Sequence, residues 1–322
     1  MPTPPTPPKV LTTMAALDKY LAPFKGIAEV IQGPSGWGVM SRAEVLSFAS
    51  ELDAIINQGE LRIDAGLLNA APKLKIVVNM AIGFNNMDLP LMASRSVWAV
   101  NTPDAVVDST ADFTIGVLLA LVRRIPELDR FVCSGQWGCF EPGRWDGAEL
   151  AGKTIGIIGY GQIGQAVARR LRAFGMNVIF HTRRNTGDSE QRSLEDLLIQ
   201  SDVVSLHVPL TPETKGLINR ERFQLMKPGA VFINMSRGKV AEETALVESL
   251  QSGHLSGAGL DVFENEPQIH PALRKMPNVV LSPHTAGGTH ESRNRAWQHC
   301  IENVVRVLQG KPPKNPLNPT KT

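Results

Sequence analysis

The chain has 322 residues, 43% of them hydrophobic and 20% charged, and its formal net charge at pH 7 is only +2. This length allows two domains with separate cores, and the balanced charge argues against a nucleic acid or an anionic membrane as a partner. The apolar stretch Phe113–Val122 is too short to span a bilayer, so it predicts a buried helix.

The start of the chain and its cysteines favour a cytoplasmic protein. Met1–Pro8 is rich in Pro and Thr and lacks the basic and apolar regions of a signal peptide, so we expect a disordered tail. Cys133, Cys139 and Cys300 are scattered and odd in number, which suits free thiols in a reducing compartment. Their spacing is not that of paired metal ligands, and we predict no metal site.

The N-terminal part of the chain alternates between strand-forming runs and helical or loop stretches. This alternation predicts a parallel α/β unit. Beyond Asn101–Pro103, the helix-capping residues Asp108–Thr110 predict a helix that runs to about Arg123. Cys133–Asp146 is irregular and rich in Trp, Gly and Pro, and we expect a surface arm there. The predicted strands are Val10–Met14, Asp53–Ile56, Ile76–Asn79 and Trp98–Asn101.

A glycine-rich turn follows the next predicted strand, Thr154–Ile158. In this turn Gly159 allows the tight bend, Gly161 allows the backbone to approach a pyrophosphate, and Gly164 allows the next helix to pack on the strand. An amphipathic helix, with Ile163, Val167, Leu171 and Phe174 on one face and Gly175 as its stop, then leads to the strand Asn177–Phe180. Strand, turn, helix and strand in this order predict a dinucleotide site, the alternative being another helix-capping glycine turn.

The residues after that second strand indicate which dinucleotide binds. An acidic residue there would bind the ribose 2′-hydroxyl of NAD and repel a 2′-phosphate. This chain has His181-Thr182-Arg183-Arg184 instead. One hydroxyl and two guanidinium groups suit a phosphate monoester, so NADP(H) is favoured over NAD(H). The alternative is that Arg183 and Arg184 are solvated loop residues.

The remaining elements alternate in the same way. They predict an α/β fold in which a doubly wound parallel sheet (Rossmann) is inserted in a smaller flavodoxin-like α/β substrate domain. We place the substrate domain at residues 1–101 and 291–322 and the dinucleotide-binding domain at residues 102–290. The last helix, about His290–Gln309, is expected to return to the first domain. The other predicted elements are helices at Ser193–Leu198, Glu221–Leu225 and Glu242–Gln251 and strands at Asp202–Leu206, Ala230–Met235, Gly257–Asp261 and Val279–Leu281.

Three polar residues follow strands of the second domain, where ligands bind in such sheets. Arg237 suits the task of holding and polarising a 2-oxo acid, and His284 suits that of protonating the oxyanion as hydride reaches carbon. A carboxylate such as Glu266 would orient the imidazole and favour its protonated form. The residues alone leave a structural alternative for each position. Arg237 could be an ordinary loop arginine, Asp261 a strand-end carboxylate that caps a turn, and His284 a buried histidine that is hydrogen-bonded to the backbone.

The sequence resembles the D-isomer-specific 2-hydroxyacid dehydrogenases, which include glyoxylate/hydroxypyruvate reductases. The likeness runs from Ile76 to Leu308 and is carried by five motifs in the family's order. These are Gly159–Gly164, Pro209–Thr214, Asn234-Met235-Ser236-Arg237-Gly238, Gly259–Pro267 and Ser282-Pro283-His284.

The resemblance implies roles for particular residues. Arg237 clamps the substrate, Glu266 is the carboxylate of the His–Glu pair and His284 is the proton donor. Glu264 competes with Glu266, which is preferred because it precedes the proline. The main-chain N–H groups of Ile82 and Gly83 bind the substrate carboxylate. The predicted cofactor contacts combine the residues chosen above from turn geometry and phosphate chemistry with those that the resemblance adds. They are Thr110, Gly159, Gly161, Gln162, Ile163, Gly164, Thr182, Arg183, Arg184, Val208, Pro209, Thr214, Met235, Ser236, Asp261, His284 and Gly287.

The predicted activity is an NADPH-preferring reduction of glyoxylate or hydroxypyruvate to the D-2-hydroxy acid. The resemblance also implies a homodimer formed through the dinucleotide domain, with Trp137 either reaching the partner's site or packed locally. Many relatives carry Ser or a larger polar pair around Ala81, so the shape of the pocket and the identity of the substrate are left open. One alternative is a reductase for longer sugar acids such as 2-ketogluconate; another is a nucleotide-sensing corepressor. His207, His254, His270, His290 and His299 have no motif partners and are expected to be structural or exposed.

Overall fold

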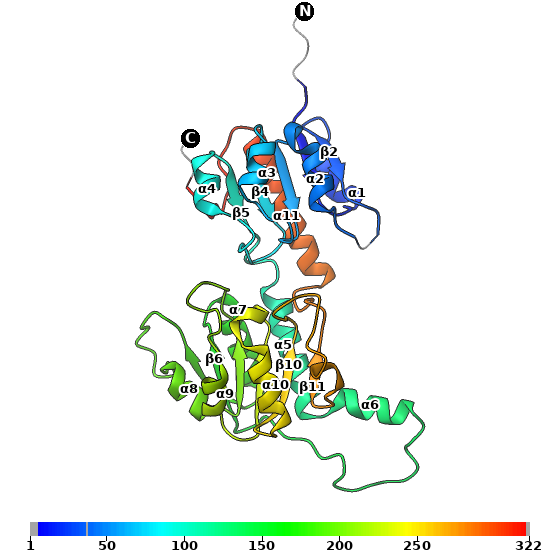
Figure 1. Cartoon of the computed structure of the whole chain (residues 1–322), viewed down its shortest axis with the longest axis vertical. Coiled ribbons are helices and arrows are strands. Elements are labelled where there is room, and N and C mark those ends of the chain that lie inside the picture. The colour runs from blue at the N-terminus through cyan, green and yellow to red at the C-terminus, as the bar shows by residue number, and fades with distance from the viewer. Residues whose placement is uncertain (1–5, 37, 320–322) are drawn as a thin grey trace, which may run out of the picture. The chain divides into compact units, whose positions relative to one another are not determined.

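The computed structural model describes residues 6–36 and 38–319, and the chain forms two compact units. One unit contains the described residues of Met1–Val106 and Thr289–Thr322, and the other is Val107–Gly288 (Figure 1). The predicted boundaries, at residues 101/102 and 290/291, lie a few residues from these limits. Of the expected tail Met1–Pro8, residues 1–5 lie outside the described residues.

The first unit contains a five-stranded sheet in the order β2-β1-β3-β4-β5, with every neighbouring pair parallel. This is the predicted flavodoxin-like order. Strand β2 was not predicted, because it lies at the edge of the sheet and its exposed or half-buried side chains lack the apolar run of a central strand. The strands are β1 Lys9–Thr12, β2 Glu29–Gln32, β3 Ala54–Asn57, β4 Ile76–Asn79 and β5 Trp98–Val100.

Helices cover both faces of this sheet because successive residues of each buried strand point to opposite sides. Ile76 and Val78 belong to the core under α1 and α11, whereas Val77 belongs to the core under α2, α3 and α4. The last helix returns to this unit, as predicted: Trp297 is buried there and stacks on Tyr20, with ring centroids 5.2 Å apart. The helices are α1 Asp18–Leu21, α2 Arg42–Phe48, α3 Ala65–Ala70, α4 Leu89–Ser94 and α11 His290–Leu308.

The second unit contains a six-stranded parallel sheet in the order β11-β10-β9-β8-β6-β7. A single parallel bridge between Phe180 and Gln191 adds one more connection beyond β7. The strand order therefore reverses between β6 and β8, which is where such sheets bind ligands at their carboxyl edge. The strands are β6 Thr154–Ile158, β7 Asn177–His181, β8 Val203–Leu206, β9 Ala230–Asn234, β10 Leu255–Leu260 and β11 Val279–Leu281.

This second sheet is doubly wound, as predicted. α5 and α7 pack on one face with Ile155, Ile157 and Ile233, and α8, α9 and α10 pack on the other face with Ile158 and Phe232. The predicted buried helix at Phe113–Val122 lies within α5. Among the residues that the structure describes, no helix is both long and apolar enough to cross a membrane. The helices are α5 Val107–Val122, α7 Gln162–Ala173, α8 Leu194–Gln200, α9 Arg220–Leu225 and α10 Glu243–Gln251.

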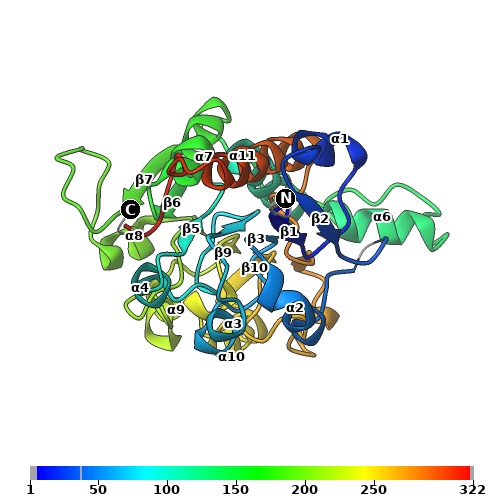
Figure 2. The same cartoon turned by 90° about the horizontal axis from the view of Figure 1, so that it is seen from above.

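One further helix, α6 (Ile125–Cys133), was not predicted and leads into the expected arm. Its sequence offered two signals, Pro126 in the first turn and the apolar residues Ile125, Leu128 and Val132 at helical spacing, although none of its residues is buried. Figures 1 and 2 both show α6 projecting from the body of its unit. We call residues 134–146 the arm; they form no helix or strand, and Trp137 and Phe140 are 57% and 87% exposed.

Candidate active site

The residues predicted to bind the dinucleotide gather at one edge of the second sheet. They follow the carboxyl ends of consecutive parallel strands, and such ends meet along one edge. The glycine-rich turn follows β6, Thr182–Arg184 follow β7, and Val208-Pro209 follow β8. Ser236 and Arg237 follow β9, and Asp261 follows β10 directly. His284 follows β11.

The glycine-rich turn has the form that a bound pyrophosphate requires. Gly159 has φ of +97°, and a Cβ atom there would lie 2.5 Å from the carbonyl oxygen of His207, so only glycine fits without strain. Gly161 is the N-cap of α7 and leaves the helix start without a side-chain cap. Apart from its two chain neighbours, no described residue has a heavy atom within 4 Å of the place where a Cβ of Gly161 would be. The residues present thus fit a phosphate group at a helix N-terminus.

The residues after β7 line an open pocket of about 400 Å³. Thr182 and Arg183 are among its lining residues, as predicted, whereas Arg184 is not. Arg192 also lines this pocket and was not selected from the sequence, because it lies beyond the motif. Its guanidinium donates to the carbonyl oxygens of Ser189 and Gln191, at 2.6 and 2.9 Å. The pocket therefore has a fixed cation in addition to Arg183.

The side chain of Gln191 cross-links the loop after β7 through four hydrogen bonds. The amide nitrogen of Gln191 donates to the carbonyl oxygens of Thr182 and Arg184, at 3.2 and 2.8 Å. Its amide oxygen accepts from both the main-chain N–H and the hydroxyl of Thr186, at 2.8 and 2.7 Å. These four bonds span the main chain on both sides of Arg183, so Gln191 fixes the turn from which Arg183 and Arg184 project.

His284 and Glu266, predicted to work as a pair, are in direct contact. Nδ1 of His284 lies 2.8 Å from Oε2 of Glu266, and the other carboxylate oxygen accepts from the N–H of Phe263 at 3.0 Å. Burial acts to raise the pKa of Glu266. The bonds from His284 and Phe263 and the charges of His284 and Arg237 outweigh it, so that this pKa lies below its usual value. Glu266 is therefore an anion beside the imidazole.

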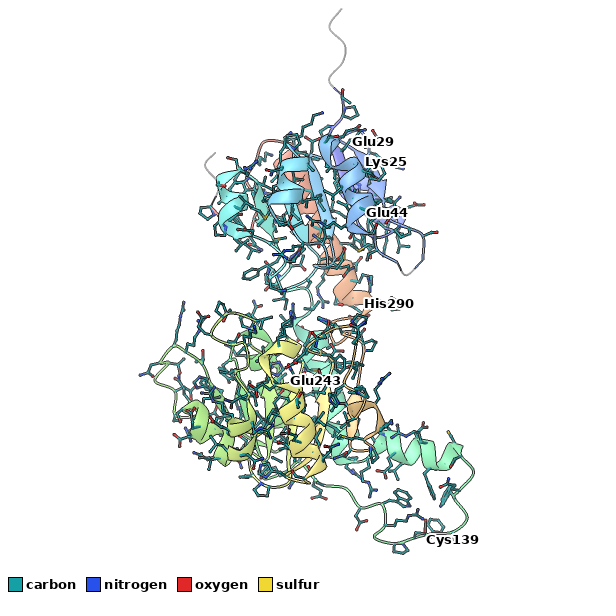
Figure 3. All side chains as sticks on the ribbon, viewed as in Figure 1. Lys25, Glu29, Glu44, Cys139, Glu243 and His290 are labelled. Carbon is teal, nitrogen blue, oxygen red and sulfur yellow. The ribbon has the colours of Figure 1, made fainter. Side chains whose placement is uncertain are left out.

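The competing carboxylate, Glu264, has a different partner. Its carboxylate accepts from the N–H of Glu243 at 3.1 Å, and the carboxylate of Glu243 accepts from the N–H of Glu264 at the same distance. Glu243, labelled in Figure 3, begins α10 and also accepts from the N–H of His270 at 2.9 Å. This reciprocal contact anchors the loop that carries Glu266, so Glu264 supports the loop and Glu266 contacts His284.

Arg237 is brought to the same place by a close approach of two loops. A Cβ atom at Gly238 would overlap the main chain of Phe263, so the segment after β9 can lie against the Glu266 loop only with glycine at this position. The Arg237 guanidinium donates to the carbonyl oxygen of Ser236 at 2.7 Å. Its burial lowers the pKa of Arg237, and the negative charge of Glu266 opposes that change. Arg237 remains a cation at neutral pH.

Asp261 holds the loop that carries His284. Its side chain is 2% exposed, and its carboxylate accepts from the Ser282 hydroxyl at 2.6 Å and from the N–H groups of Thr285 and Ala286, both at 2.8 Å. The N–H of His284 donates to the carbonyl oxygen of Asp261 at 2.9 Å. His284 has φ of +52°, a conformation that a histidine keeps only where its surroundings fix it. In this structure Asp261 therefore caps the turn that carries His284, which was the structural alternative stated for this residue.

The other predicted cofactor residues occupy the same unit without forming a further cluster. Thr110 is buried in α5, and the hydroxyl of Thr214 donates to the carbonyl oxygen of Pro209 at 2.6 Å. Met235 and Ser236 are buried. The carbonyl oxygen of Gly287 accepts from the hydroxyl of Ser109 at 3.1 Å. Ile82 and Gly83 belong to the first unit, in the loop after β4, where Asn101 donates to the carbonyl oxygen of Ile82 at 2.7 Å.

Of the histidines without motif partners, His207 is distinctive. Its Nε2 lies 2.9 Å from the hydroxyl of Ser205, while its Nδ1 is buried and has no hydrogen-bond partner among the described residues. Burial lowers the pKa of His207 to about 4, so the ring is neutral near pH 7. Across residues 6–36 and 38–319, no group of three or more His, Cys, Asp or Glu side chains is arranged to hold a metal ion.

Comparison with known proteins gives matches along nearly the whole chain. Residues 115–286 match the sequence pattern of the D-isomer specific 2-hydroxyacid dehydrogenase NAD binding domain. Glyoxylate reductase from Thermococcus kodakarensis is 40% identical over 321 residues, which cover 97% of this chain and 96% of that protein. Glyoxylate reductase from Aeropyrum pernix is 43% identical over 287 residues, which cover 85% of each.

Solved structures agree in fold over the same length. The TT0316 protein from Thermus thermophilus superposes with a TM-score of 0.90 at 38% identity, covering 96% of this chain and 99% of that one. The NADPH-dependent glyoxylate/hydroxypyruvate reductase from Sinorhizobium meliloti, solved with NADP and malonate, has a TM-score of 0.84 at 31% identity and 97% coverage of both chains.

Proposed function

The chain belongs to the D-isomer-specific 2-hydroxyacid dehydrogenase family of NAD(P)-dependent oxidoreductases, and from this premise we propose that it reduces glyoxylate or hydroxypyruvate with NADPH. The product is the D-2-hydroxy acid where the new centre is chiral. One observation carries the proposal: the 2.8 Å contact between Nδ1 of His284 and Oε2 of Glu266. The reductases from Thermococcus kodakarensis and Sinorhizobium meliloti support the choice of substrate.

His284 is the proposed proton donor. Because Nδ1 is engaged by Glu266, the other ring nitrogen, Nε2, is the one that gives its proton to the substrate oxygen. The anionic Glu266 fixes the ring orientation and stabilises the imidazolium before transfer. The reduced nicotinamide, when bound, supplies the hydride that reaches the substrate carbon.

Arg237 is proposed to hold the 2-oxo acid and to polarise its oxo group. A half-buried guanidinium stabilises the negative charge that develops on that oxygen more strongly than it would in water. The proposed ligands of the substrate carboxylate are the main-chain N–H groups of Ile82 and Gly83.

The preference for NADPH rests on the pocket after β7. Thr182 and Arg183 line it together with Arg192, and Arg184 belongs to the same turn. A ribose 2′-phosphate accepts hydrogen bonds from guanidinium groups and is repelled by carboxylates. The pocket is also lined by one carboxylate, that of Asp188, which accepts from the N–H of Glu190 at 2.8 Å, so the two lining arginines outnumber it. For the remainder of the dinucleotide, the proposed contacts are the other cofactor residues named in the sequence analysis, of which Thr110 is the first in the chain and Gly287 the last.

We propose further that the protein is a cytoplasmic homodimer whose contact includes α6 and the arm. Support comes from the exposure of Ile125, Val132, Trp137 and Phe140 along one projecting element, an arrangement typical of a surface that a partner covers. Figure 3 places Cys139 on this arm, away from the sheet. Sedimentation of the Phe140→Asp variant tests this point, with dissociation to monomers as the expected result.

The activity is tested by following NADPH and NADH oxidation with glyoxylate, hydroxypyruvate, pyruvate and 2-ketogluconate. We expect the highest kcat/KM for glyoxylate or hydroxypyruvate with NADPH. A higher value for 2-ketogluconate would instead identify a sugar-acid reductase. Absence of oxidation with all four acids would contradict the proposal.

A further inference from the structure

Three neighbouring strands of the first sheet lead into buried asparagines. Asn57 ends β3, Asn79 ends β4, and Asn101 follows β5. Asn57 and Asn79 are 0% exposed and Asn101 is 7% exposed. Asn57 and Asn79 are aligned across the sheet, and the amide nitrogen of Asn57 donates to the amide oxygen of Asn79 at 3.0 Å. Burying three amides is costly unless each one is hydrogen-bonded, so their partners are informative.

Two of these amides hold the loop that follows β4. The amide nitrogen of Asn79 donates to the carbonyl oxygen of Gly83 at 2.9 Å, and that of Asn101 donates to the carbonyl oxygen of Ile82 at 2.7 Å. Asn86 closes the other end of the loop. Its amide oxygen accepts from Asn79 at 2.7 Å, and its amide nitrogen donates to the carbonyl oxygen of Leu61 at 2.8 Å.

The main-chain groups of this loop are used unequally. Its carbonyl groups accept hydrogen bonds from protein donors. In addition to the bonds to Ile82 and Gly83 described above, the carbonyl oxygen of Ala81 accepts from the N–H of Thr102. The carbonyl oxygen of Phe84 accepts from the N–H of Met87. By contrast, within the described part of the chain no N–H group from Ala81 to Asn86 donates to a protein acceptor. Four successive carbonyl groups are thus held by the protein, and the N–H groups stay available to an anion.

We propose that Asn79 and Asn101 are positioning residues, which hold the carbonyl groups of Gly83 and Ile82 so that the loop presents its N–H groups to the substrate carboxylate. This inference rests on the proposed function. A neutral amide suits the task because it donates to a carbonyl oxygen and places no negative charge near the bound acid. An aspartate of the same size would have no proton to donate and would repel the carboxylate.

The test compares Asn101→Ala and Asn101→Asp with the unsubstituted protein in steady-state reduction of glyoxylate by NADPH. Loss of one well-formed hydrogen bond predicts a KM for glyoxylate about tenfold higher in the alanine variant, and higher still in the aspartate variant. The KM for NADPH should be unchanged, since Asn101 is not one of the predicted contacts of the dinucleotide. The aspartate variant keeps the side-chain volume and carries the test if the alanine variant does not fold.

Asn318 provides a matched control in the same unit. It is 3% exposed, and its amide nitrogen likewise donates to a carbonyl oxygen, that of Val97, at 2.9 Å. Asn318→Ala should lower the melting temperature and leave the KM for glyoxylate unchanged. Equal KM values in the unsubstituted protein and both Asn101 variants would overturn this inference alone. Failure of the unsubstituted protein to reduce any 2-oxo acid would overturn the proposed function and this inference with it.

Discussion

Nδ1 of His284 lies 2.8 Å from Oε2 of Glu266, although the two residues are 18 positions apart in the chain. Two loops are fixed independently to make this contact. Asp261 accepts three hydrogen bonds from the loop of His284, and Glu243 and Glu264 exchange main-chain bonds beside Glu266. The imidazole is therefore oriented before any substrate binds.

Replacing the proposed donor tests the centre of the mechanism. We expect His284→Gln to lower kcat by about 10² to 10⁴, because glutamine cannot release a proton to the substrate oxygen. The affinity for NADPH, measured by calorimetric titration, should be retained. His290→Gln, at an exposed histidine of the first unit, is the control and should keep full turnover. Near-normal turnover of the His284 variant would remove it from the proposed mechanism.

The two arginines after β7 test the choice of dinucleotide. The double variant Arg183→Ala, Arg184→Ala removes charge-assisted bonds to a 2′-phosphate, which predicts a KM for NADPH about 10 to 100 times higher. The KM for NADH should change little, because NADH has a hydroxyl in place of that phosphate. Steady-state kinetics with both dinucleotides measure this difference, and an equal loss for the two would refute the phosphate assignment.

Gln191 provides a separate test of the same pocket. Gln191→Met keeps the length of the side chain but removes its four bonds to Thr182, Arg184 and Thr186. We expect the KM for NADPH to rise several-fold and that for NADH to stay the same. In the background of the double arginine variant, the substitution should add nothing further, since the cations it orients are gone.

Gln251→Met, at an exposed glutamine of α10, is the matched control for this substitution and should not affect either KM. If Gln191→Met weakened NADPH and NADH alike, Gln191 would be important for the fold of the unit and not for the orientation of the arginines.

The close approach at Gly238 predicts a loss of activity from a single added methyl group. Gly238→Ala would force the Arg237 segment away from the main chain of Phe263 and so separate Arg237 from the Glu266 loop. We expect kcat/KM to fall by about 10² or more, because small displacements of binding groups are costly in catalysis. The control is Gly116→Ala in α5, where helix propensity improves and, apart from the helix's own backbone, no heavy atom of the described residues lies within 4 Å of the new methyl group. An unaffected kcat/KM in the Gly238 variant would contradict the structure at this point.

His207 predicts a pH dependence of stability. Its pKa is about 4 in the folded chain against 6.5 for an ordinary histidine, so between these values the unfolded chain binds a proton that the folded chain does not. Stability is therefore full above about pH 6.5 and falls as the pH is lowered towards 4, by at most about 3 kcal/mol from this residue.

Thermal unfolding at about pH 7 and about pH 5.5 measures this effect above the range where carboxylates titrate. We expect the melting temperature of His207→Phe to fall less between these two values than that of the unsubstituted protein. An identical fall in both proteins would show that His207 is not the group responsible.

Much of the fold could be predicted from the sequence because its signals are local. Thr154–Ile158 and Ile76–Asn79 are continuous apolar or β-branched runs, and the structure has both strands at the same bounds. The edge strand β2 was missed because its side chains are exposed or half-buried and give no apolar run. Helix α6 was missed although Ile125, Leu128 and Val132 recur at helical spacing, because it is short and none of its residues is buried in the unit.

The residue types of the candidate site were also available from the sequence, since motif order alone selected Arg237, Glu266 and His284. Their arrangement was not, because contacts between distant loops depend on how strands are ordered in the sheet and how their loops pack. The position of Glu266 before the proline already favoured it over Glu264, and the structure adds that Glu266 contacts His284 whereas Glu264 contacts Glu243. Only the tertiary structure placed Arg192 beside Arg183 and showed Asn79 and Asn101 holding one loop. Local patterns thus determined the elements of this protein, and long-range packing decided which side chains meet.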